Sequence, residues 1–352
     1  MGKSYHGLAT GVGSFPSQEP EEALEIIFDR VPLIPHWPQL PQKDATESMV
    51  RQYLTPLLQK GLVKEDAEGT PYFTVDTAAG EEYLRNFMTN FPLAEDQINA
   101  YAFPAETAAG FYAFAQALED RPRPRYLKGQ ITGPLTMGLT VYDLNGKPAF
   151  YNKVFRKILT LTLALQVRWQ IRYFRRFNLP FILFIDEPGL YLVGKKDHTS
   201  FTRQDVADSL RHLLSVAQEE GAEVGVHTCA GTDWTFLFAL PFDIVNLDIY
   251  HFFSTLLPFA VELDSFLARG GTLAWGLIPT SREVQEHTAE SLAALMRNYQ
   301  EQLIQAGVEA KRLKRQYLLT PSCGAGTLTA QEVRRVYRLL QEVSSKILTG
   351  EL

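Results

Sequence analysis

Eight short apolar runs, each followed by a longer segment with helical periodicity, constrain the fold of this 352-residue chain more than any other feature. The short runs indicate strands. In the longer segments apolar residues recur at three- and four-residue steps, which indicates helices that bury one face. A strand followed by a helix eight times over predicts an α/β protein built as a parallel (β/α)8 TIM barrel.

The predicted elements alternate along almost the whole chain. The strands are expected at Ala9–Phe15, Leu33–Trp37, Tyr126–Ile131, Phe181–Ile185, Glu223–Thr228, Ile244–Ile249, Thr272–Leu277 and Tyr317–Thr320. The helices are expected at Glu19–Asp29, Ala105–Glu119, Asn152–Phe177, Arg203–Glu220, Asp233–Ala239, Thr255–Arg269, Ala289–Gln305 and Gln331–Leu348.

One segment, residues 42–103, departs from the alternation. A hairpin is predicted around Gly61–Val75, with its turn at Glu68-Gly69, and a helix at Glu81–Asn90. Because this insertion follows the second predicted strand, we expect it to lie over the C-terminal mouth of the barrel, where substrates bind. There is no internal repeat or low-complexity linker, so residues 1–352 are predicted to form a single TIM-barrel domain.

The composition excludes some classes of partner. The chain is 45% apolar and 21% charged, as in an ordinary soluble globular protein, and its formal net charge is −6. This charge gives no electrostatic reason to expect nucleic acid or an anionic membrane as a partner. No signal peptide is recognisable, and the run Ile158–Ile171 is too short and too polar to span a bilayer. A cytoplasmic location is therefore expected.

The chain has two cysteines, and both follow predicted strands. Cys229 lies two residues after His227, and residues two apart on a strand have side chains on the same face, so His227 and Cys229 would face the same point. Cys323 follows the last predicted strand. Three interpretations compete: a zinc site with one position left open, buried core residues, or a disulfide between the cysteines. The ends of barrel strands are where functional groups gather, which favours the metal.

Several short stretches, in this order, give the chain a resemblance to a known family. They are Gly13-Ser14-Phe15-Pro16, Lys128-Gly129 with Thr132-Gly133-Pro134, Ile185-Asp186-Glu187-Pro188, His227-x-Cys229, the run Asp243 to Asp248, and Pro321-Ser322-Cys323-Gly324. The chain resembles the catalytic C-terminal barrel of cobalamin-independent methionine synthase. More broadly, it resembles the superfamily that also contains uroporphyrinogen decarboxylase and the zinc methyltransferases acting on coenzyme M.

The resemblance implies roles for individual residues. His227, Cys229 and Cys323 match the zinc ligands of the family, and Asp248 matches the position of a glutamate that is the fourth ligand. Asp186 matches a carboxylate that receives the amino group of homocysteine; a salt bridge with Lys128 is the structural alternative. The backbone at Val12, Gly13 and Ser14 matches the place where the carboxylate of that substrate lies.

The chemistry expected of such a site is methyl transfer to a thiol. A free thiol has a pKa of about 8.5 and is mostly protonated at neutral pH, whereas zinc holds it as the nucleophilic thiolate. An in-line methyl group can then pass to sulfur, with zinc as thiol activator and template. This chemistry predicts a zinc-dependent thiol S-methyltransferase, and the resemblance implies that its thiol is homocysteine and its product methionine.

Two departures from the family pattern bear on the methyl donor. We expect no counterpart of the N-terminal barrel that helps to hold methyltetrahydrofolate, because 352 residues leave no room for it. The proton-donating histidine of the family, in the loop after the seventh strand, is replaced here by the sequence Gly276 to Ser281. Both departures favour methylcobalamin or a methylated corrinoid protein as the donor. The alternatives are a coenzyme M methyl- or alkyltransferase, a uroporphyrinogen decarboxylase-like enzyme, and a non-catalytic zinc- or corrinoid-binding protein.

Overall fold

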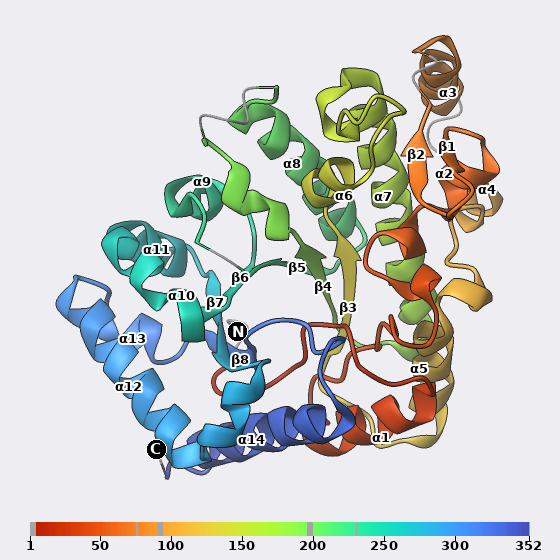
Figure 1. Ribbon diagram of the computed structural model, residues 1–352. Helices are drawn as coiled ribbons and strands as arrows, with labels where there is room; N and C mark the ends of the chain where they lie inside the picture. Colours follow the sequence, from red (N-terminus) through yellow and green to blue (C-terminus); the bar gives the residue numbers. More distant parts are fainter. Residues whose placement is uncertain (1–4, 75–76, 90–93, 196–199, 230, 352) are drawn as a thin grey trace.

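A curled parallel sheet forms the centre of the molecule (Figure 1). The computed structural model describes residues 5–74, 77–89, 94–195, 200–229 and 231–351. Six strands pair in the order of the chain, as in a half-barrel. They are β3 (Leu127–Thr132), β4 (Phe181–Asp186), β5 (Glu223–Thr228), β6 (Ile244–Leu247), β7 (Thr272–Ile278) and β8 (Tyr317–Pro321). The fold is mixed α/β and TIM-like, and these six strands confirm six of the eight predicted ones.

Helices surround the sheet on its outer side (Figure 1). The helices of the described residues are α1 (Pro20–Arg30), α2 (Thr55–Gln59), α3 (Thr77–Thr89), α4 (Glu95–Asn99), α5 (Ala109–Asp120), α6 (Pro134–Thr140), α7 (Lys153–Phe174), α8 (Arg203–Glu219), α9 (Trp234–Ala239), α10 (Ile249–Leu256), α11 (Ala260–Ala268), α12 (Ala289–Gln305), α13 (Ala310–Leu313) and α14 (Ala330–Leu348). Of these, α2, α3 and α4 belong to the 42–103 segment and lie away from the central sheet. Among the described residues, no helix is both long enough and apolar enough to cross a membrane.

Side-chain caps set the start of the long helices. The Asn152 side chain accepts hydrogen bonds from the backbone of Val154 and Phe155 and so begins α7. Thr329 and Glu332 form a reciprocal capping box at the start of α14. One predicted helix, Thr255–Arg269, is instead divided into α10 and α11 by a short turn that contains Pro258, which lacks the N–H that an uninterrupted helix requires.

The first two predicted strands do not form as regular strands. The segments Ala9–Phe15 and Leu33–Trp37 make only isolated β-bridges, at Ala9, Ser14 and His36. Prolines in and beside the second segment (Pro32, Pro35 and Pro38) remove donors from a ladder, which explains its irregularity. In the first segment Gly11 lies so close to its neighbours that an added Cβ would be 2.1 Å from His36 Nε2.

These two segments nevertheless join the edges of the sheet. Thr10 N donates to Leu319 O of β8 at 3.0 Å, and Lys128 N of β3 donates to Pro35 O at 3.0 Å. The first segment also meets the residues that follow the second one, where Phe15 N donates to Gln39 O at 2.8 Å. Backbone hydrogen bonds therefore run from β8 through both segments to β3.

Side chains alternate between the two faces of each strand, and this alternation builds the barrel interior. On β4, Ile182 and Phe184 face inward and belong to a small apolar cluster, whereas Leu183 and Ile185 face outward toward the helices. Asp186, two residues beyond Phe184, continues the inward series. The same alternation places buried polar side chains at inward positions near the ends of other strands of the sheet: Gln130, Thr132, His227, Asn246 and Thr320.

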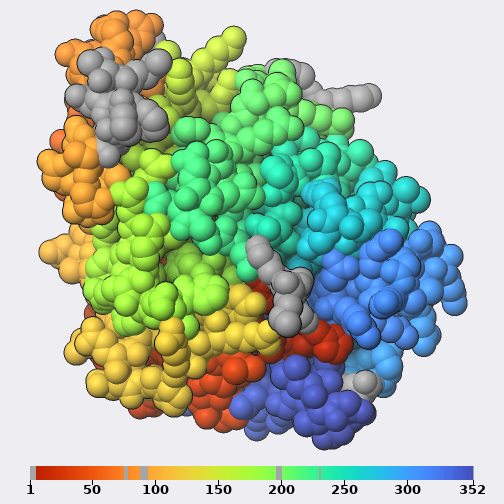
Figure 2. Space-filling model, turned by 180° about the vertical axis from the view of Figure 1, so that it is seen from behind, coloured from red at the N-terminus to blue at the C-terminus, as the bar shows by residue number. Residues whose placement is uncertain are grey.

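The 42–103 segment has two parts. The hairpin forms from β1 (Val63–Glu65) and β2 (Pro71–Phe73), and α3 follows it; Val75 and Asn90, the last residues of the predicted hairpin and helix, lie outside the described residues. Hairpin and helix form a corner of the molecule beside α7 (Figures 1 and 2). The preceding residues, which include Ser48 and Met49, instead reach the cavity described below.

Candidate metal centre

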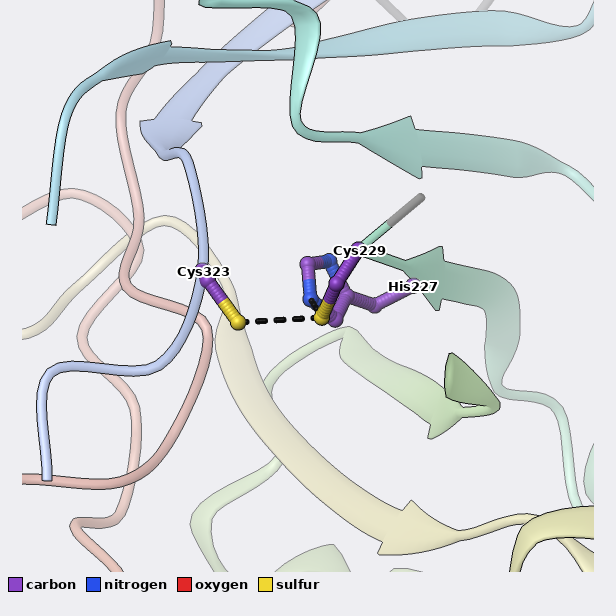
Figure 3. Close-up of side chains that lie close together, drawn as sticks. All are labelled: His227, Cys229 and Cys323. Atoms are coloured by element: carbon purple, nitrogen blue, oxygen red, sulfur yellow. Dashed lines mark hydrogen bonds between the residues drawn. The ribbon is translucent and has the colours of Figure 1, made fainter. Parts of the chain in front are cut away.

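Two strand ends bring His227, Cys229 and Cys323 together (Figure 3). His227 ends the inward series of β5, Cys229 follows that strand, and Cys323 comes two residues after β8. Cys229 Sγ lies 3.0 Å from His227 Nε2 and 3.0 Å from Cys323 Sγ. The potential ligand atoms all lie within 4.8 Å of one another, and no second such group is found among the described residues.

Asn246 determines which nitrogen of His227 faces the sulfurs. Its side-chain nitrogen donates to Ala274 O at 2.9 Å and to Thr320 Oγ1 at 2.8 Å. Because a carbonyl oxygen can only accept, the amide oxygen of Asn246 must be the atom beside His227 Nδ1, 2.5 Å away. Nδ1 therefore carries the proton, and Nε2 presents a lone pair to the cysteines.

Asn246 is a residue whose role the sequence did not indicate, and its removal tests that role. Asn246→Ala is expected to weaken zinc binding by about 10–100-fold, because hydrogen-bond partners of metal ligands typically contribute that much. Competition with a chromophoric chelator measures the effect. Asn246→Asp keeps an oxygen beside Nδ1 and should bind zinc more tightly than Asn246→Ala; equal affinities would contradict the role.

The contact between the two sulfurs shifts the pKa values of both thiols in opposite directions. The hydrogen bond from Cys229 lowers the pKa of Cys323 to about 4, and the same bond raises the pKa of Cys229 above its ordinary value. Burial lowers the pKa of His227, but its hydrogen bond with Cys323 and the charge of that thiolate outweigh burial and raise the pKa. The negative charge at Cys323 would be neutralised by a bound cation.

The donor set fits zinc. One imidazole nitrogen and two thiol sulfurs are the soft and borderline ligands that this metal takes, and three such ligands leave a position for substrate. The competing disulfide is not formed, since both cysteines are free and their sulfurs lie 3.0 Å apart, well beyond the bond length of about 2.0 Å.

Asp186 lies beside this group. It ends β4, and its register partner on β5 is His227. Its Oδ1 is buried and has no hydrogen-bond partner. Burial raises the pKa of Asp186 to about 6, and the positive charge of Lys128 works in the opposite direction. An unpaired acceptor atom at the end of a barrel strand suits a cationic group of a ligand.

Lys128 is directed elsewhere. Its Nζ donates to Val12 O and, at 3.2 Å, to Gln130 Oε1, and burial lowers its pKa to about 8. Lys128 therefore attracts Asp186 by its charge but makes no hydrogen bond to Asp186 Oδ1. Lys128 instead holds the Val12 backbone at the mouth of the barrel.

A cavity of about 340 Å³ connects these groups. Its polar lining includes Asp186, His227, Cys229 and Cys323, and Val12 and Ser14 lie on its wall. Apolar side chains complete it, namely Pro41, Met49 and Pro188. Gly13 packs against Gln130, because a Cβ there would be 2.8 Å from the Gln130 side chain. The cavity thus combines sulfur, carboxylate and apolar surfaces.

Asp248 lies apart from the three potential ligands. It follows β6, and both of its carboxylate oxygens contact His251 in the first turn of α10. Among the described residues, the group whose ligand atoms lie within 4.8 Å of one another does not include Asp248. The structure therefore brings together three of the four expected ligands.

Comparison with known proteins gives a likeness in fold. No family model matches the sequence, and a search of curated proteins finds no match. Among solved structures, a B12-independent methionine synthase from Shewanella sp. W3-18-1, in complex with selenomethionine, covers 99% of both chains with a TM-score of 0.57 and 14% identity. The chain shares the fold of that structure.

At 14% identity this likeness extends to the fold alone. An amidohydrolase structure, also 14% identical, covers 68% of this chain and 61% of its own, and its TM-score of 0.29 is too low to carry an argument. The roles of residues in the site therefore rest on the geometry of this chain.

Proposed function

We propose that the protein is a zinc-dependent methyltransferase that methylates the sulfur of homocysteine and so forms methionine. The observation that carries the proposal is the convergence of His227, Cys229 and Cys323 on the wall of a cavity that also contains the Asp186 carboxylate. The fold likeness to a methionine synthase structure supports it, and that structure holds selenomethionine, which has the same amino-acid framework as the proposed product.

His227, Cys229 and Cys323 would hold the zinc, and the bound metal would keep the substrate thiol in its thiolate form. The remaining steps depend on the residues of the chain. Asp186 binds the ammonium group of homocysteine, and the backbone at Val12 and Ser14 receives its carboxylate. Met49 and Pro188 exclude water from the sulfur.

Methyl transfer is then a direct displacement. The sulfur forms a bond to the methyl carbon while the bond from that carbon to the donor breaks, and its electron pair leaves with the donor. From a methylated corrinoid the leaving cobalt(I) needs no proton. From methyltetrahydrofolate the departing nitrogen needs one.

The loop after β7 bears on this difference. Thr280 contacts the Ser322 hydroxyl through both its backbone nitrogen and its own hydroxyl, each at 3.0 Å. Neither hydroxyl is acidic enough to protonate a departing amine at neutral pH. Methylcobalamin or a methylated corrinoid protein is accordingly the proposed donor.

The proposed location is the cytoplasm, where the two free cysteines would stay reduced.

The donor is tested by following methionine formation together with the cobalamin absorption spectrum. We expect methyl transfer from methylcobalamin to homocysteine and none measurable from methyltetrahydrofolate. The Cys323→Ser variant serves as the blank for non-enzymatic transfer. Methionine formed from the folate as fast as from methylcobalamin would contradict the proposed donor and identify a proton donor among the residues at the mouth.

Homocysteine is favoured over coenzyme M by Asp186. Coenzyme M carries a sulfonate where homocysteine carries an amino acid, and a carboxylate on the cavity wall repels an anion but attracts an ammonium group. A steady-state comparison of the two thiols distinguishes the candidates.

A further inference from the structure

The carboxylate of Asp248 is turned toward helix α10. Its Oδ1 accepts a hydrogen bond from the backbone nitrogen of His251 at 2.9 Å, so that Asp248 caps the helix. Its Oδ2 lies 2.7 Å from Nδ1 of the same histidine. The Asp248 side chain is only 8% exposed. One residue in the first turn of α10 thus engages both oxygens of a nearly buried carboxylate.

His251 is held from its other side as well. Its Nε2 lies 3.0 Å from Oε2 of Glu283, in the 3-10 helix η8 (Arg282–Glu286) that follows β7. That same Glu283 oxygen accepts a hydrogen bond from Ser281 at 2.8 Å. A chain of polar contacts therefore runs from the end of β6 through α10 to η8, and it fixes the ring that faces Asp248.

Asp248 cannot bind a metal and keep both of its hydrogen-bond contacts with His251. To coordinate a cation beside Cys229 and Cys323, an oxygen of Asp248 would have to turn away from the helix cap or from the imidazole. Aspartate is one methylene shorter than glutamate, so its carboxylate reaches less far from the strand end. The three potential ligands already lie within 4.8 Å of one another among the described residues, without Asp248.

We propose that the zinc centre has three protein ligands, His227, Cys229 and Cys323, and that Asp248 caps α10 and is held off the metal by His251. The fourth position is then open to the substrate thiol without displacement of a protein carboxylate. This inference rests on the proposed zinc site and concerns only its coordination.

The test compares metal binding in matched variants of the full chain. Asp248→Asn and Asp248→Ser keep a side chain that can cap α10. Zinc affinity is measured by chelator competition, with Cys323→Ser as the control for loss of a ligand. We expect both Asp248 variants to stay within threefold of the wild-type affinity, whereas Cys323→Ser loses more than about 100-fold, since even outer hydrogen-bond partners contribute about 10–100-fold.

A spectroscopic measurement separates ligation from folding. In the cobalt(II)-substituted protein, the visible d–d bands report the ligand set, and Asp248→Asn should leave them unchanged. His251→Ala should shift the bands, because it frees Oδ2 of Asp248 to approach the metal. Adding Asp248→Asn to His251→Ala should restore the wild-type bands.

The outcomes are distinguishable. Loss of more than threefold in zinc affinity in both Asp248 variants, or altered bands in Asp248→Asn, would overturn the three-ligand centre and leave the metal site standing. Unchanged bands in His251→Ala would overturn the role of His251. A wild-type protein without stoichiometric zinc would overturn the proposed function and this inference together.

Discussion

Cys323→Ser is expected to abolish stoichiometric zinc binding and methyl transfer together. The wild-type protein should contain about one zinc per chain, as expected for three protein ligands and an open position. The variant should lose more than about 100-fold in zinc affinity, because a hydroxyl is a much poorer ligand than a thiolate and even outer partners contribute about 10–100-fold. Elemental analysis of the purified protein and chelator competition measure both quantities.

Two further variants make this result specific. His227→Ala should lose zinc as Cys323→Ser does, because its Nε2 lies beside the sulfurs. Met49→Leu changes the wall of the same cavity without removing a ligand, so it should retain the metal. Stoichiometric zinc in the double variant Cys229→Ser/Cys323→Ser would show that the metal binds elsewhere.

Asp186→Asn is expected to weaken the use of homocysteine by about 1.5–3 kcal/mol, which is roughly ten- to a hundredfold in kcat/KM. The reason is the loss of a charge-assisted hydrogen bond to the ammonium group of the substrate. The measurement compares homocysteine with 4-mercaptobutyrate, which lacks only the amino group. The second thiol should be affected far less.

Glu187→Gln provides a matched control for this prediction. Glu187 is the neighbouring carboxyl, but its oxygens accept hydrogen bonds from the backbone of Leu135 and Thr136 and from the Thr136 hydroxyl. Its substitution should lower stability and affect both thiols alike. Equal losses for the two thiols in Asp186→Asn would remove Asp186 from substrate recognition.

Periodicity in the sequence predicted the six regular strands to within about two residues. The strands β4 to β8 coincide with apolar runs whose backbone N–H groups are all available for pairing except at Pro321, so the local pattern and the strand pairing agree. The segments near Ala9 and His36 are not regular strands, and the prediction was wrong there. The pattern of apolar residues does not register the prolines beside His36 or the close approach of the backbone at Gly11. Their place between β3 and β8 depends on closure of the sheet, which no local window contains.

The candidate site divides in the same way. The pair of His227 and Cys229 follows from the two-residue period of a strand, and the position of Cys323 at a strand end suggested where it would lie. The role of Asn246 was not predictable, because it depends on partners on β7 and β8. Asp248 and His251 are three residues apart, yet the sequence could not show whether the carboxylate faces the metal or the helix.

The order in which the chain is made has a consequence for the loading of the metal. Cys229 and Cys323 are 94 residues apart, and β8, which precedes Cys323, also bonds to the segment at Ala9 and Thr10. During synthesis the ribosome therefore releases two of the three potential ligands, His227 and Cys229, long before Cys323 is made. A nascent chain offers a cation only a histidine and one thiol, so firm capture waits until the last strand docks against the first residues of the chain. Zinc bound as proposed would link the end of β5 to the end of β8, and its binding would therefore stabilise the docking of β8.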